Sequence, residues 1–130
     1  MVCIDTDVII HFLRDKEELA KKLENLKEKG FSLNTTAVNG FELWKGAYRS
    51  GKKGATVAVE NCLNEFDVLP LDKKSCKKSA ELFEKLKSEG KMVDELDVMI
   101  ASIAIVHGEK ILTLNKKHFE RIPGVELMEF

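Results

Sequence analysis

The feature that most constrains this chain is the alternation of short apolar runs with longer amphipathic segments. Four runs have the length of strands, at residues 2–4, 31–36, 66–71 and 110–114. Between them, apolar side chains recur every three or four residues, as on one face of a helix. Strands that alternate with helices favour parallel pairing, because a helix carries the chain back to the same edge of the sheet. The sequence therefore predicts a three-layer α/β/α domain with a central, mostly parallel sheet.

The helical segments differ in how much of their surface is apolar. Predicted helices cover residues 8–13, 15–30, a segment around 41–47, 55–65, 72–90 and 94–107, and residues 126–129 are a candidate last strand. Asp15 is placed to cap the second helix and Gly30 to end it. Residues 98–106, VMIASIAIV, are apolar on every side, which indicates a buried helix.

Length and composition describe an ordinary globular chain. The 130 residues fit one domain, over residues 1–130, and a hydrophobic content of 44% allows a core without disulfides or metals. A net charge of -1 excludes a strong basic field over the whole molecule, so any nucleic-acid contact has to come from local patches.

The cysteines and the apolar runs indicate a cytoplasmic protein with no membrane association. The three cysteines, Cys3, Cys62 and Cys76, have neither zinc-site nor redox-pair spacing, and Cys3 lies in an apolar run typical of a core. No signal peptide is apparent, and residues 98–106 are too few to cross a bilayer.

Several acidic side chains fall where the predicted strands end or the next helices begin. Asp5 ends the first strand, Glu42 lies on the helix after the second, and Asp97 lies in the first turn of the apolar helix. In a parallel sheet, ligands bind outside the carboxyl ends of the strands. Each acid alone has a plain explanation: Asp5 as a helix cap, Glu42 as a solvated residue, and Asp97 as a partner of the helix dipole.

Together these acids indicate chemistry. Carboxylates held close together repel one another and require cations, and Mg²⁺ prefers such oxygen ligands. A carboxylate-held ion suits the hydrolysis of phosphodiesters. Asp7 and Asp94 are further candidate ligands, and Thr113 and Asn115 are polar residues at the end of the fourth strand.

Three segments resemble the PIN-domain toxins, the VapC-like ribonucleases of VapBC toxin–antitoxin systems, along nearly the full chain. CIDTDVIIHFL resembles the opening strand and acid, TTAVNGFELWKGA the second block, and LDVMIASIAIVHGEKILTLNKKHFERIPGVEL the closing block. The resemblance implies that Asp5, Glu42 and Asp97 bind metal, with Thr113 and Asn115 as the polar pair beside them.

The same resemblance implies an endoribonuclease dependent on Mg²⁺ or Mn²⁺. It also implies a homodimer and inhibition by a small VapB-like antitoxin. One departure concerns the acid that the family often carries near the end of the fourth strand, where this chain has Asn115 and His118. A catalytically weak module that binds RNA or metal is therefore an alternative, and a metal phosphohydrolase acting on small phosphoesters is a third reading.

The remaining polar and aromatic residues have competing interpretations. Two basic groups follow Glu42 and Asn115 and could contact RNA phosphates or form a solvated face: Lys45, Arg49, Lys52 and Lys53, then Lys116, Lys117 and Arg121. Phe41 and Trp44 are expected in the core or a dimer interface, with an antitoxin groove as the alternative. His107 and His118 are expected to be structural.

Overall fold

Four strands form the sheet predicted from the alternating pattern. The computed structural model describes residues 1–129, apart from the Lys16 side chain. β1 (Val2–Ile4), β2 (Leu33–Thr36), β3 (Asp67–Leu69) and β4 (Lys110–Leu112) lie in the order β3-β2-β1-β4, and every neighbouring pair is parallel. Cys3 of β1 pairs with Asn34 of β2 and Ile111 of β4. The carboxyl ends of β1, β2 and β4 therefore meet at one edge.

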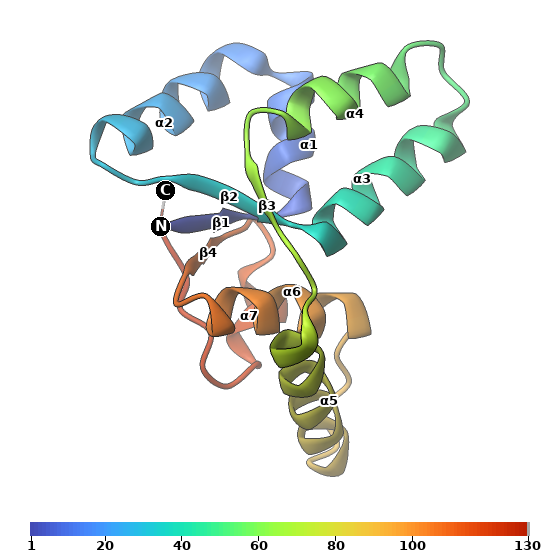
Figure 1. The fold of residues 1–130 in the computed structure, drawn as a ribbon, viewed down its shortest axis with the longest axis vertical. Helices are drawn as coiled ribbons and strands as arrows, with labels where there is room; N and C mark the ends of the chain where they lie inside the picture. Colours follow the sequence, from blue (N-terminus) through green and yellow to red (C-terminus); the bar gives the residue numbers. More distant parts are fainter. Residues whose placement is uncertain (130) are drawn as a thin grey trace.

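Helices cover both faces of this sheet, which confirms the three-layer prediction (Figure 1). Figure 1 shows α1 (Thr6–Arg14), α2 (Lys16–Glu28) and α4 (Ala55–Leu63) above the sheet, and α5 (Lys73–Ser88), α6 (Glu95–Val106) and α7 (Lys116–Glu120) below it. α3 (Ala37–Ser50) follows β2 directly and leaves the sheet at its carboxyl edge.

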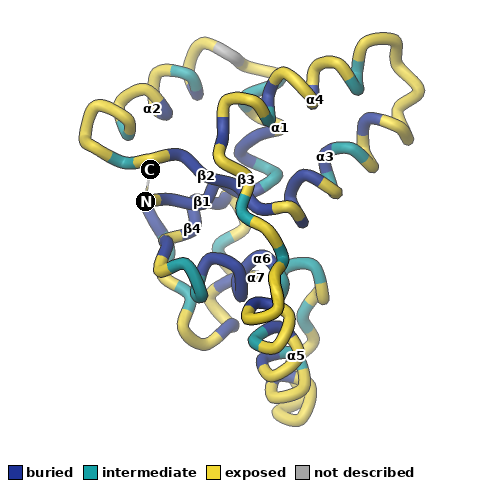
Figure 2. Tube along the Cα trace, in the orientation of Figure 1, coloured by how far each residue is buried: buried dark blue, intermediate teal, exposed yellow. Residues whose placement is uncertain are grey.

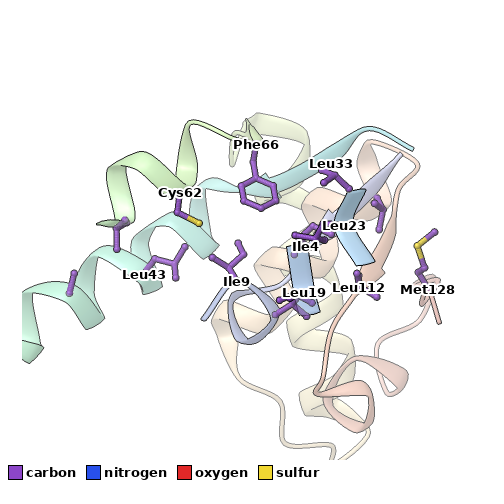
Figure 3. Close-up of a cluster of buried hydrophobic side chains, with 14 residues drawn as sticks. Ile4, Ile9, Leu19, Leu23, Leu33, Leu43, Cys62, Phe66, Leu112 and Met128 are labelled. Carbon is purple, nitrogen blue, oxygen red and sulfur yellow. The ribbon is translucent and has the colours of Figure 1, made fainter. Parts of the chain in front are cut away.

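The sheet separates two hydrophobic cores because successive side chains of a strand point to opposite faces. Val2 and Ile4 face the core built with α1–α4, whereas Cys3 faces the core built with α5–α7. Figure 3 shows the first core, in which Leu19 and Leu23 lie beside Ile4 and Leu43 lies beside Ile9. Figure 2 shows that β1, β2, most of β4 and the inner helix faces are buried, whereas β3 is largely exposed.

α6 is the buried helix that its apolar sequence predicted. Val98, Ile100 and Ile103 are each at most 1% exposed. Within residues 1–129, the structure contains no helix with the length and apolar character needed to cross a membrane. The Asp94 side chain caps α6 by accepting hydrogen bonds from the backbone N–H groups of Leu96 and Asp97.

Several local predictions were wrong. Residues 126–129 form no strand; Leu127 makes one isolated bridge to Ile111, although backbone hydrogen bonds hold the segment beside β4. Asp15 is the residue before α2, but its side chain makes no capping hydrogen bond. α7 was not predicted, because five residues carry too little periodicity to identify a helix. Phe41, expected in the core or a dimer interface, is not in the core: it is 53% exposed, with the Lys45 ammonium over its ring.

Candidate functional site

Asp5 is the most buried acid of the candidate site and does not act as a helix cap. It precedes α1 and is only 7% exposed, yet its carboxylate makes no capping hydrogen bond to that helix. Instead, Oδ1 accepts a hydrogen bond of 3.0 Å from Asn39 Nδ2, and Oδ2 accepts one of 2.7 Å from Thr113 Oγ1. Asp5 is thus held between α3 and the residue that follows β4.

Asn39 connects Asp5 to Glu42. The start of α3 forms a capping box in which Thr36 and Asn39 bond one another through side chain and backbone. That box fixes the Asn39 side chain, whose amide also donates 2.9 Å to Thr6 Oγ1. Thr6 Oγ1 in turn donates 2.7 Å to Glu42 Oε1. A continuous chain of hydrogen bonds therefore orients two of the predicted metal-binding acids.

Thr113 and Asp7 extend the network on the other side of Asp5. Thr113 is 1% exposed, and its hydroxyl lies 3.4 Å from Asp7 Oδ2. Asp7 Oδ1 also accepts a hydrogen bond from the backbone N–H of Leu114. Asn115 contributes its backbone N–H to Thr113 Oγ1, but its exposed side chain lies beside His118 rather than Asp5. Of the predicted polar pair Thr113 and Asn115, Thr113 is therefore the one whose side chain contacts Asp5.

Asp97 approaches from the opposite face of the sheet. It lies in the first turn of α6, and its side chain is 20% exposed. His118 of α7 places Nδ1 3.5 Å from Asp97 Oδ2. His107, by contrast, places its Nδ1 2.9 Å from the Ile103 carbonyl of its own helix, in agreement with a structural role.

Electrostatics show that the predicted acids are neighbours. Burial raises the pKa of Asp5 to about 6, and the negative charges of Asp7 and Glu42 add to the rise. Burial likewise raises the pKa of Glu42, to which Asp97 contributes, and that of Asp97, to which Asp94 and Asp5 contribute. Each of Asp5, Glu42 and Asp97 thus feels the charge of another.

The site brings the acids near one another without closing them around an ion. Within residues 1–129, no group of three Asp, Glu, His or Cys side chains is assembled as a metal cage. Mg²⁺ does not require such a cage, since it typically keeps several waters and binds one or two carboxylates. Of the predicted basic residues, Lys45 lies close enough to lower the pKa of Glu42.

Two residues of the network, Thr6 and Asn39, were missed by the sequence analysis. The signal for Asn39 was present: Thr36 and Asn39 stand three apart at the start of a helix, as in a capping box, and Asn39 precedes Glu42 by three residues on the same helical face. Thr6 gave no comparable signal, because its partners come from another element.

The PIN domain family model matches residues 2–125. The chain belongs to the PIN domain family. In this member of the family, Asp5 and Asp7 follow β1 at the carboxyl edge of the sheet, and Asp7 contacts the residues that follow β4.

Relatives of this PIN domain include named ribonucleases. The chain is 27% identical over 128 residues to the tRNA(fMet)-specific endonuclease VapC of Salmonella typhimurium, covering 98% of this chain and 96% of that protein. It is also 27% identical over 122 residues to Ribonuclease VapC1 of Methanocaldococcus jannaschii, covering 93% and 80%.

Solved structures agree with the PIN fold over the whole domain. DNA-bound VapBC from Salmonella typhimurium contains a chain with a TM-score of 0.87 and 26% identity, covering 98% of this chain and 96% of that one. VapBC2 from Rickettsia felis, bound to a promoter DNA fragment, contains one with a TM-score of 0.90 and 24% identity, covering 100% and 99%. At that identity the second match is evidence for the fold.

Proposed function

We propose that this protein is a metal-dependent endoribonuclease, the toxin of a type II toxin–antitoxin pair. The proposal rests on the hydrogen-bonded chain that joins Asp5 to Glu42 and on the raised pKa of Asp5, Glu42 and Asp97, to which burial contributes most and the charge of another of these acids adds. Membership of the PIN family and the ribonuclease names of its relatives support the reaction class. Hydrolysis of RNA phosphodiesters is the chemistry proposed for this edge.

In this proposal, Asp5, Glu42 and Asp97 hold Mg²⁺ or Mn²⁺, with Asp7 and Asp94 as additional oxygen donors. The donor set fits hard divalent cations, and mutual repulsion of the acids favours a cation between them. When bound, the ion supplies positive charge at the phosphate and lowers the pKa of a bound water. Asp94 is the weaker candidate, because its carboxylate already caps α6.

The other residues of the site position these acids and receive the substrate. Thr113 and Asn39 fix the two oxygens of Asp5, which keeps the carboxylate in one orientation. Asn115 is exposed beside this point and is available to a phosphate or a sugar hydroxyl. Lys45 and Arg49, both exposed on α3, are proposed to bind RNA phosphates beyond Glu42.

A groove between α1, α2 and α4 is the proposed binding site of the antitoxin. It has a volume of about 570 Å³, and Phe12, Leu23 and Val57 contribute apolar side chains to it. Val57 is 60% exposed and adds to the apolar surface of this groove. Solved structures of similar chains are VapBC complexes, which supports a VapB-like occupant.

We further propose a cytoplasmic homodimer built from this single domain.

Cleavage assays test the proposal directly. With Mg²⁺ or Mn²⁺, the wild-type protein should cleave RNA, with tRNA(fMet) as the first substrate because a relative carries that name. EDTA should abolish cleavage, as should Asp97→Asn. Induced expression should arrest growth in the wild type but not in Asp5→Ala. Normal cleavage by Asp97→Asn would remove the mechanism.

A weakly catalytic RNA- or metal-binding module is the second candidate. One observation favours it: the end of β4 carries Asn115 and His118, so the site lacks an acid there among the described residues. Metal titration distinguishes the two functions. Metal that binds the wild type but not Asp97→Asn, without cleavage of any RNA tested, would favour the binding module.

A further inference from the structure

The exposed side of α3 carries aromatic and basic side chains in alternation. Phe41, Lys45 and Tyr48 follow one another at intervals of four and three residues, which places them on one face of the helix. Arg49 lies next to this face, and all four residues are exposed. Phe41 is 53% and Tyr48 is 73% exposed, so one helix presents two rings to solvent. Together the four residues form a continuous surface, the α3 stripe.

The α3 stripe begins at the candidate site. Phe41 directly precedes Glu42, and the Lys45 ammonium lies 5.3 Å from the centre of the Phe41 ring. The positive charge of Lys45 also opposes the rise in the pKa of Glu42, which places Lys45 near that carboxyl as well. From there, α3 runs away from the sheet toward the periphery (Figure 1). The stripe is therefore a surface along which a long substrate would leave the site.

Tyr48 is held by a neighbouring ring. Its ring centre lies 6.3 Å from that of Trp44, with an angle of 31° between the two ring planes. Trp44 is half-buried and packs against the core built with α1–α4. Aromatic pairs at such distances attract one another. The contact restricts the Tyr48 ring and leaves most of its surface open, which suits a platform for another flat group.

The charge of this region favours a polyanion. Residues 37–53 contain four basic side chains and one acidic side chain, Glu42, although the whole chain has a net charge of -1. Proteins that bind single-stranded nucleic acid combine such a positive surface with aromatic rings on which bases stack. The stripe contains rings and cations but no aliphatic side chain of the kind that an amphipathic partner helix would bury. RNA therefore fits this surface better than a protein helix does.

The spacing of the two rings suits a strand of RNA. Phe41 and Tyr48 are separated by seven positions on α3, which is about 10 Å along a helix axis at about 1.5 Å per residue. Successive bases of a stacked strand are about 3.4 Å apart, so bases about three positions apart can reach both rings. Lys45 and Arg49 lie beside this path, where the phosphates of the same strand would pass.

We propose that Phe41 and Tyr48 are specificity-determining residues that stack unpaired bases of the RNA, beside the phosphates bound by Lys45 and Arg49. The inference rests on the proposed function, because it extends the substrate site outward from Glu42. Stacking on a ring requires a base with a free face, and the bases inside a duplex have none. The stripe therefore selects single-stranded segments of RNA for cleavage.

The test is fluorescence anisotropy of the full chain in EDTA, with a labelled oligoadenylate of about 12 nucleotides and with an RNA duplex of the same length. Phe41→Leu and Tyr48→Leu should each weaken binding of the single strand at least about fivefold and change binding of the duplex by less than about twofold. Tyr48→Phe keeps the ring and should match the wild type. Val68→Ala is the control, because it alters an exposed apolar residue of β3 outside the stripe. Circular dichroism checks that each variant folds.

Salt dependence separates stacking from charge. Each phosphate contact with a single strand adds about 0.7 to the slope of log affinity against log salt concentration. Arg49→Ala should therefore reduce the slope by about 0.7. Tyr48→Leu should lower the affinity at every salt concentration and leave the slope unchanged. A reduced slope in Tyr48→Leu would contradict a stacking role for this ring.

Light scattering tests the alternative occupant of the stripe, a second copy of this chain. A lower molar mass for Phe41→Leu or Tyr48→Leu than for the wild type would make the stripe an interface between copies and overturn the inference. An equal loss of affinity for single strand and duplex would also overturn it. Wild-type affinity in both ring variants, from a protein that cleaves RNA with Mn²⁺, would overturn the stacking role alone. A wild-type protein that neither bound nor cleaved RNA would overturn both proposals.

Discussion

Thr113 donates a hydrogen bond of 2.7 Å to Asp5 Oδ2 across a sequence separation of 108 residues. The bond stabilises the charged form of a carboxylate whose pKa burial raises to about 6. β4 and β1 are neighbours in the sheet, which places the residues after each strand side by side. The acid at the centre of the site thus depends on a hydroxyl from the far end of the chain.

Thr113→Val removes this hydroxyl with little change of shape. Because the hydrogen bond lowers the pKa of Asp5, its loss should raise that pKa further. The acidic limb of the pH–activity profile for RNA cleavage should then move to higher pH. Thr113→Ser, which keeps the hydroxyl, should retain the wild-type profile. Identical profiles for the valine variant and the wild type would contradict the assigned role.

Asp5→Asn should separate stability from activity. With its pKa raised to about 6, Asp5 is charged above that pH at a cost to the folded state. A neutral amide removes this cost, so the variant should gain about 1–2 kcal/mol of unfolding free energy at pH 7.5 in EDTA, one pKa unit being about 1.4 kcal/mol. Urea denaturation measures the gain. Saturating Mn²⁺ should stabilise the wild type more than the variant, and a variant less stable than the wild type in EDTA would contradict the prediction.

Asn39→Ala tests the residue that joins the capping box to the site. The change removes the amide that donates to Asp5 and Thr6 and the half of the α3 capping box in which Asn39 Oδ1 accepts from the Thr36 N–H, whereas Thr36 Oγ1 still accepts from the backbone N–H of residue 39. The loss in unfolding free energy should be about 1–3 kcal/mol, as expected for a weakened cap and a buried carboxylate left with one partner fewer. Asn25→Ala, at an exposed position of α2, is the matched control. Denaturation curves that coincide for the two variants would rule the role out.

The buried Glu109 leads to a prediction about stability that does not involve the candidate site: the free energy of unfolding should depend on pH. It is 5% exposed just before β4; Asn34 donates to Oε1, and Oε2 has no hydrogen-bond partner among the described residues. Burial raises its pKa, although the Asn34 hydrogen bond, the N-terminal ammonium and His107 oppose the rise, and Asp67 adds to it.

The sign follows from proton linkage. A carboxyl with a raised pKa binds its proton more tightly in the folded state, so stability should fall as pH rises from the unfolded value of 4.5 through the folded pKa. Glu109→Gln cannot titrate and should lose less stability over that window. Urea denaturation of both proteins at pH 5 and pH 8 provides the comparison. A constant difference between them would show that Glu109 does not titrate differently on folding.

Patterns in the sequence predicted the order of strands and helices because burial imposes a period on each element. The apolar run of α6 and the helical spacing of Leu19 and Leu23 in α2 are examples: α6 is largely buried, and in α2 these two leucines are buried while most other residues are exposed. Element ends were less accurate, since β3 extends only over Asp67–Leu69 and residues 126–129 make one bridge. A short segment beside β4 can be held there by a single bridge, and the apolar pattern of the sequence does not distinguish such a segment from a strand.

The acids of the candidate site could be singled out from the sequence because a charged group next to a buried segment is costly without a partner. The side chains that hydrogen-bond to these acids could not be predicted. Thr6 and Asn39 are ordinary polar residues at helix starts, and their roles arise only when α1 and α3 meet. The hydrogen-bond partners of Asp5 could not be predicted either. Its position suggested a helix cap, whereas its carboxylate oxygens accept hydrogen bonds from Asn39 and Thr113.

The position of β1 between β2 and β4 bears on how such an enzyme is made. During translation, Asp5 leaves the ribosome first and Thr113 follows more than a hundred residues later. Until β4 is synthesised and joins β1, the nascent chain has Asp5 but not the hydroxyl that orients its carboxylate. A chain with this topology therefore completes the surroundings of its most buried acid only after nearly all of its residues have been made.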